Sequence, residues 1–176
     1  VAVGVMHARL VIVEGRCVHR LSVLARCEAC VRVCPRSAWS IDAQGLGFDD
    51  ARCDRCGLCT VACPVGALAL PSPQVASRFA QRVEPDGAPV LTLYCEKVVG
   101  APTTVGGLPC IHAIDEAQLL RWHAQGSRRL EAFTGGCATC SRRTGEGLAE
   151  RVLRLNVALG PRAKPLLRLA VINGPA

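Results

Sequence analysis

The residues with the most recognisable chemistry are four closely spaced cysteines in the first half of the chain. They are Cys53, Cys56, Cys59 and Cys63, and Pro64 follows, so the run reads C-x2-C-x2-C-x3-C-P. Zinc sites use two close pairs separated by a long gap, whereas three consecutive steps of three residues let three thiolates enclose one face of an iron–sulfur cube. The proline turns the chain away, so that Cys63 can reach a second cluster. This spacing predicts iron–sulfur chemistry.

A second run has the same form without its first member. It consists of Cys27, Cys30 and Cys34, followed by Pro35. The missing cysteine would occupy position 24, which is leucine. Cys17 lies upstream, and a loop of residues 18–26 could return it to the vacant place at a modest entropic cost. Two alternatives stay open: a [3Fe–4S] cluster with Cys17 as a buried structural thiol, or ligation by His19.

Together the two runs resemble the two-cluster bacterial ferredoxin fold over about residues 9–71. Strands are expected at residues 38–42 and 66–70, with a turn at residues 44–47. The resemblance implies that each run sends its last cysteine to the cluster of the other run. One [4Fe–4S] cluster would take Cys53, Cys56, Cys59 and Cys34. The other would take Cys27, Cys30, Cys63 and, in a departure from the family pattern, Cys17.

Four further cysteines lie in the second half, and all follow expected strands. They are Cys95, Cys110, Cys137 and Cys140. Ligand sites in open α/β sheets lie at the carboxyl ends of strands, so we expect these thiols to converge. We favour a third iron–sulfur cluster over zinc, a redox thiol pair or unligated thiols. His112 and His123 are expected to be surface or packing residues, and Trp39 and Trp122 to pack rather than to relay electrons.

The segments around these four cysteines predict alternating strands and helices. Strands are expected at residues 90–94 and 129–133. Asp115 is a suitable cap for a helix that Gly126 ends, and Ser141 can cap a final helix. The apolar stripe of that final helix is Leu148, Val152, Leu155 and Leu159. This alternation predicts a small α/β domain with a partly parallel sheet.

The predicted fold class is α+β, with two domains. Residues 1–71 form the ferredoxin-like two-cluster domain, and residues 90–160 form the small α/β domain. Residues 72–89 are expected to be a linker with a short helix at residues 74–82. Residues 161–176 are expected to be a tail that docks onto a partner.

The second half also carries a family resemblance. The pattern Cys110-x4-Asp115, then Gly126, then Gly135-Gly136-Cys137-x2-Cys140 resembles the small iron–sulfur subunit of methyl-viologen-reducing hydrogenases and of heterodisulfide reductase-type proteins. The resemblance covers about residues 90–160 and implies a [2Fe–2S] cluster and a flavin-containing partner. The spacing of the four thiols leaves [2Fe–2S] and [4Fe–4S] both open.

Composition and charge narrow the class of protein. Aromatic residues make up only 3 %, which excludes a core built on large rings. No apolar stretch approaches the roughly 18 residues that span a bilayer. The net charge of +7 comes without the basic clusters and interleaved aromatics of nucleic-acid surfaces. Each oxidised four-thiolate cluster carries about −2, so three of them would bring the net charge to about +1.

We therefore expect an electron-transfer subunit that relays electrons between partner subunits of a larger oxidoreductase. The sequence has no dinucleotide fingerprint and no Ser–His–Asp constellation, so we expect no catalysis by this chain alone. No secretory signal pattern is present, which favours a cytoplasmic, reducing compartment. The alternatives are an iron–sulfur cluster carrier, maturation or scaffold protein, and a zinc-stabilised binding module.

Overall fold

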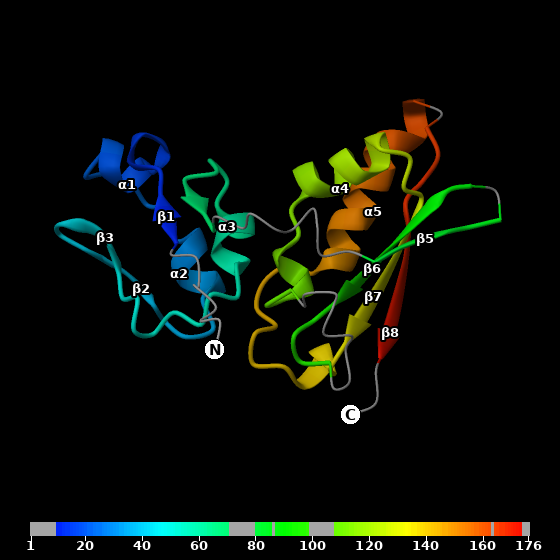
Figure 1. Ribbon diagram of the computed structural model, residues 1–176. Coiled ribbons are helices and arrows are strands. Elements are labelled where there is room, and N and C mark those ends of the chain that lie inside the picture. Colours follow the sequence, from blue (N-terminus) through cyan, green and yellow to red (C-terminus); the bar gives the residue numbers. More distant parts are fainter. Residues whose placement is uncertain (1–9, 71–79, 86, 99–107, 163, 174–176) are drawn as a thin grey trace, which may run out of the picture.

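Two groups of elements, one from each half of the chain, lie side by side in the computed structural model (Figure 1). The structure describes residues 10–70, 80–85, 87–98, 108–162 and 164–173. Short helices and two-stranded sheets make up the first group, and a four-stranded sheet with helices makes up the second. The architecture is therefore mixed α+β, as the sequence predicts.

The first half is built from very short elements. They are β1 (Val11–Ile12), η1 (Glu14–Arg16), α1 (Val18–Leu21), α2 (Ala29–Val33), β2 (Trp39–Asp42), β3 (Gly45–Phe48), α3 (Leu58–Ala62) and β4 (Leu68–Ala69). β2 and β3 form an antiparallel hairpin, and β1 pairs antiparallel with β4. The strands at 38–42 and 66–70 are present in shortened form. The expected turn at residues 44–47 is wrong in part, because Gly45 already pairs with Asp42 in the hairpin.

The second half contains longer elements. They are β5 (Ala80–Val83), β6 (Pro89–Tyr94), η2 (Ile111–Ala113), α4 (Glu116–Ala124), β7 (Arg129–Thr134), η3 (Cys137–Thr139), α5 (Leu148–Leu159), η4 (Gly160–Arg162) and β8 (Arg168–Asn173). The strand order is β5-β6-β7-β8, with β6, β7 and β8 parallel and β5 antiparallel. The predicted partly parallel sheet is therefore confirmed.

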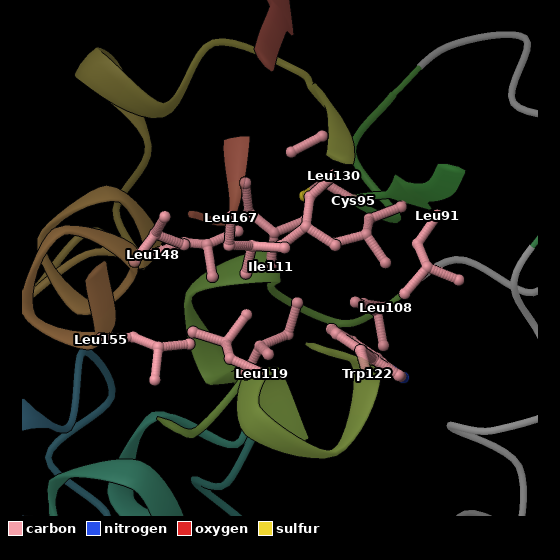
Figure 2. Close-up of a cluster of buried hydrophobic side chains, with 14 of the residues drawn as sticks. Leu91, Cys95, Leu108, Ile111, Leu119, Trp122, Leu130, Leu148, Leu155 and Leu167 are labelled. Carbon is pink, nitrogen blue, oxygen red and sulfur yellow. The ribbon is translucent and has the colours of Figure 1, made fainter. Parts of the chain in front are cut away.

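α4 and α5 cover one face of this sheet, and the core lies between them and the strands (Figures 1 and 2). Along β7, Leu130 and Ala132 are fully buried, while Arg129 and Glu131 alternate with them and are half-buried. This period of two is expected for a strand with one face on the core. The predicted apolar stripe of α5 is buried as a whole.

The ends of α4 follow their predicted capping signals. The carboxylate of Asp115 accepts a hydrogen bond from the amide of Gln118 at 2.6 Å, as an N-cap residue does. Gly126 has a φ of +98°, which lets the chain leave the helix.

The start of α5 differs from the expectation. The helix begins at Leu148 and not after Ser141. The imidazole of His112 takes the capping role, because its Nδ1 accepts a hydrogen bond from the amide of Leu148 at 3.0 Å. A ring nitrogen from a distant segment thus satisfies a backbone donor that the local sequence leaves free.

Two segments join the sheet that the sequence analysis assigned elsewhere. Residues 80–82, expected to end a helix, lie in β5 and pair with β6, and residues 74–79 lie outside the described residues. The expected tail supplies β8 as the outermost strand beside β7. Leu167, just before β8, is buried in the core, which explains why this segment folds onto the domain. Pairing with a neighbouring strand has overridden the Pro-rich composition that suggested a linker and a tail.

In the part of the chain that the structure describes, no helix has the length and apolar character needed to cross a membrane.

Replacing Leu130 by alanine should test the core of the second half. Leu130 is 0 % exposed on the central strand β7, so the cavity should lower the free energy of unfolding by about 2 to 5 kcal/mol. Leu153 on α5 is 66 % exposed, and L153A should change the free energy of unfolding by less than about 0.5 kcal/mol. Urea unfolding of anaerobically purified protein measures both, and equal losses would contradict this description of the core.

Candidate iron-sulfur sites

The eight cysteines of the first half surround two separate hollows, formed where α2 lies against α3. Site 1 is defined by Cys17, Cys27, Cys30 and Cys63. Site 2 is defined by Cys34, Cys53, Cys56 and Cys59. The hollows measure about 340 and 330 Å³, including the space open to solvent. The structure thus brings together the same two sets of four that the sequence analysis assigned to two clusters.

The exchange of ligands follows from the way the two short helices end. Cys34 is the C-cap residue after α2 and Cys63 is the C-cap residue after α3, and each of these cysteines has extended backbone that leaves the helix. The amide of Ala38 donates to the Cys34 sulfur at 3.3 Å, and the amide of Ala67 donates to the Cys63 sulfur at 3.2 Å. The two runs therefore fold alike. Each gives its final sulfur to the other site, with an N–H group already directed at that sulfur.

Cys17 lies at site 1 together with Cys27, Cys30 and Cys63. It is 7 % exposed and lines the hollow, whereas Leu24, at the position that the run leaves vacant, is 83 % exposed. The loop of residues 18–26 therefore returns Cys17 to the site. His19 also lines this hollow, but its Nε2 donates to the Cys27 carbonyl at 2.6 Å, so that nitrogen is already engaged.

Burial lowers the acidity of four of the thiols in these two sites. It raises the pKa of Cys30 to about 11 and those of Cys56 and Cys59 to about 12. Burial also raises the pKa of Cys53. Without metal these thiols are neutral at pH 7, and iron must displace their protons in order to bind.

The donor set fits a polynuclear cluster better than a single ion. Among the described residues, no three His, Cys, Asp or Glu side chains are arranged to hold one metal ion. Thiolates around one zinc ion would lie within about 4 Å of each other, because each Zn–S bond is about 2.3 Å. In a [4Fe–4S] cluster each cysteine binds a different iron atom, so its four sulfurs stand farther apart. Four soft sulfur donors around each hollow suit that group.

The buried core of the first half is itself rich in these ligands. Of its eleven buried members among the described residues, four are cysteines of sites 1 and 2, and a fifth is Cys110 from the second half. Trp39 is another member, and its ring lies 4.6 Å from that of Phe48, which agrees with the predicted packing role. Trp39 also lines site 2, where its hydrogen bond to Cys59 opposes the effect of burial on the pKa of that thiol. That contact with a candidate ligand is one that sequence reasoning missed.

The remaining four cysteines gather at the carboxyl ends of β6 and β7, as predicted. Cys95 directly follows β6, and Cys137 follows β7 after a two-glycine turn. Cys110 precedes η2, and Cys140 follows η3. Burial raises the pKa of Cys110 to about 11, and the nearby thiols of the other three add to this rise. We call the set Cys95, Cys110, Cys137 and Cys140 site 3.

Gly135 permits the loops of site 3 to meet. A Cβ atom at this position would lie 2.5 Å from the carbonyl oxygen of Lys97, two residues after Cys95, and 2.8 Å from its carbonyl carbon. Both contacts are with backbone, which cannot rotate away as a flexible side chain can. The glycine therefore allows the chain that leads to Cys137 to lie directly against the chain that follows Cys95.

The two histidines of the second half have structural partners. His123 is buried, and its Nε2 donates to the Pro165 carbonyl at 2.7 Å, which agrees with the expected packing role. His112 caps α5 through Nδ1. Burial lowers the pKa of His112, and the charges of Arg143 and Arg151 lower it further, so the ring stays neutral and able to accept.

A buried arginine links sites 2 and 3, and sequence reasoning missed it. Arg142 donates to Asp54, which lies between two ligands of site 2, and to Glu96, which follows Cys95. Burial alone would raise the pKa of Asp54, but the hydrogen bond and charge of Arg142 hold it below its usual range. The pairing joins residues far apart in sequence, so no local pattern could have revealed it.

Comparison with known families bears on sites 1 and 2, in the first half of the chain. Residues 25–67 match the family model described as a 4Fe-4S dicluster domain, which supports a ferredoxin-type domain, the binding of [4Fe–4S] and a role in electron transfer. The match includes seven of the eight cysteines of sites 1 and 2 and leaves out Cys17. No curated protein and no solved structure shows a significant match to the chain.

Replacing Cys17 by alanine should separate the two candidates for the fourth ligand of site 1. C17A should lose about one iron per chain if a three-iron cluster remains, or about four if the cluster is lost. H19A should keep the full iron content, because Cys17 completes the set. Iron and sulfide analysis, with EPR of the anaerobic proteins, distinguishes the two variants. A loss of iron in H19A together with full content in C17A would reverse the assignment.

Replacing Gly135 by alanine should disturb site 3 alone. The added methyl group would collide with the Lys97 backbone and separate the two loops, so any iron bound by site 3 should be lost and about eight iron atoms retained. Gly160, which has open space where its Cβ would be, provides the matched control. G160A should keep the iron content of the unaltered protein, and equal content in both variants would argue against this assembly.

Proposed function

We propose that this chain is an electron-relay subunit with three iron–sulfur centres: a [4Fe–4S] cluster at each of sites 1 and 2, and a third cluster at site 3. The observation that carries the proposal is the grouping of eight cysteines into two sets of four, with ligands exchanged between α2 and α3. The family match to a 4Fe-4S dicluster domain supports this interpretation for residues 25–67.

A cluster of this kind takes up and returns one electron when bound, and the protein residues set how readily it does so. Here the amides of Ala38 and Ala67 are directed at ligand sulfurs, which favours added negative charge. Apolar neighbours such as Leu46 and Leu68 lie within the same buried core and limit access of water. Backbone dipoles and burial are the two means by which this chain would adjust its potentials.

Burial of the thiols favours a relay over a carrier. A protein that delivers clusters must expose its ligands to an acceptor, whereas six of the twelve cysteines here are buried. These are Cys17, Cys30, Cys56, Cys59, Cys95 and Cys110. Ligands enclosed in this way suit clusters that stay in place while electrons pass.

The acidity of the thiols argues against the interpretation of site 3 as a redox thiol pair. Reactive thiols have a lowered pKa, but burial raises the pKa of both Cys110 and Cys137. Metal ligation remains the chemistry that four converging thiols can perform. The iron content of site 3, two atoms or four, distinguishes [2Fe–2S] from [4Fe–4S].

Partner subunits would supply the electron donor and acceptor, and a flavin-containing subunit is the class implied by the resemblance of the second half. All twelve cysteines are free thiols. A reducing compartment such as the cytoplasm would keep them available for iron.

Metal analysis tests the proposal directly. The anaerobically purified chain should contain about 10 to 12 iron atoms, an equal or similar amount of sulfide, and almost no zinc. Replacing Cys137 by alanine should remove only the iron of site 3 and leave about eight atoms. About eight iron atoms in both proteins would remove site 3 from the proposal, and a colourless, sulfide-free protein would end it.

A further inference from the structure

Arg142 is buried at the junction between the two halves of the chain. Its Nε donates to Oδ2 of Asp54 at 2.7 Å, and its Nη1 donates to the Pro109 carbonyl at 2.7 Å and to Glu96. Its side chain is 10 % exposed. One guanidinium group therefore holds three separate segments at once.

Each of these three segments bears a candidate ligand. Asp54 stands between Cys53 and Cys56 of site 2, and its other carboxylate oxygen accepts from the amide of Cys56 at 3.3 Å. Glu96 directly follows Cys95, and Pro109 directly precedes Cys110. Arg142 itself lies two residues after Cys140. The arginine thus connects one loop of site 2 with the ligand-bearing segments of site 3.

Independent contacts bring the same two sites together. Cys110 belongs to the buried core of the first half, which also contains Cys56 and Cys59 of site 2. Gly57, within the cysteine run of site 2, comes so close to η2 that an added Cβ would lie 2.9 Å from the Cβ of Ala113. The hydroxyl of Thr144, two residues after Arg142, donates to the Val33 carbonyl at the end of α2.

We propose that Arg142 is a positioning residue that fixes site 3 against site 2, and that site 2 is consequently the middle centre of a linear relay from site 1 to site 3. This inference rests on the proposed function, because it requires a cluster at site 3. Sites 1 and 2 are already joined, since α2 and α3, each with its C-cap cysteine, contribute one candidate ligand to each site. Transfer between neighbouring sites moves one electron and makes or breaks no bond.

The chemistry of arginine suits this role. A guanidinium group presents several donors in one rigid plane, so it can bind Asp54, Glu96 and a carbonyl together, whereas a lysine ammonium is a compact charge on a flexible stem. The positive charge also favours the reduced state of a nearby cluster, because reduction adds negative charge. Removing the charge would leave two carboxylates facing each other across the junction. Arg142 should therefore affect both the spacing of the sites and the potential of site 2.

Three variants test the proposal. R142Q removes both the charge and the planar set of donors. R142K keeps the charge but not the planar donors, and R154Q is the matched control. Arg154 on α5 also pairs with two carboxylates, Glu116 and Glu146, but its side chain is 55 % exposed and neither carboxylate adjoins a cysteine in the sequence. The measurements are iron content, an EPR-monitored redox titration of the site 2 cluster, and the magnetic interaction between the centres at sites 2 and 3.

In R142Q the reduced-to-oxidised ratio of site 2 at a fixed potential should fall about tenfold, which equals 59 mV for one electron, and its magnetic interaction with site 3 should weaken. In R142K the reduction potential of site 2 should stay close to that of the unaltered protein, but its magnetic interaction with site 3 should weaken. R154Q should change neither quantity. If R142Q does not retain iron, R142K carries the test, because a weakened interaction at full iron content supports the proposal.

An unchanged interaction in R142K and R142Q, at full iron content, would overturn the inference while leaving the proposed function intact. A failure of the proposed function looks different. In that case the unaltered protein would hold about eight iron atoms and show no magnetic interaction with a third centre, and the linear relay would fall with it.

Discussion

The exchange of Cys34 and Cys63 between α2 and α3 is the constraint on which the first half of the chain depends. Its helices and strands contain two to five residues each, and a two-stranded sheet of that size is marginal by itself. Its buried core consists to a large extent of cysteines, whose thiols are a poor substitute for leucine in volume. Cross-links through inorganic clusters would supply the connection between α2 and α3 that apolar packing gives in larger domains.

The second half is stabilised differently, by apolar packing. Leucine side chains from β6, β7, α4 and α5 fill a conventional core between one sheet face and two helices (Figure 2). Site 3 is therefore placed on a scaffold that has its own source of stability. The cysteines of sites 1 and 2, Cys17 apart, occur in dense runs, whereas those of site 3 come from three separate segments that meet only in the folded chain.

Sequence reasoning was most effective where the chemistry is local. The spacing of Cys53, Cys56 and Cys59 restricts the possible metals, and the capping signal at Asp115 depends on an amide three residues away. It was least effective where partners are distant. The pairing of β5 and β8 with the sheet, the capping of α5 by His112, and the bridge made by Arg142 all depend on segments that meet only after folding. Composition around residues 72–89 and 161–176 suggested a linker and a partner-docking tail, because prolines there obscured the strand pattern.

The loop of residues 18–26 begins and ends at the same site, because the residues that flank it, Cys17 and Cys27, line the same hollow. Its tip is fully accessible, with Val23 94 % exposed. A protease that cut the chain at this tip would produce two fragments, yet with a cluster at site 1 the iron–thiolate bonds would still hold them together. A chelator that withdrew the metal would then leave the N-terminal fragment held by packing and by the short pairing of β1 with β4. The cluster would in this respect act as a removable cross-link between two stretches of polypeptide.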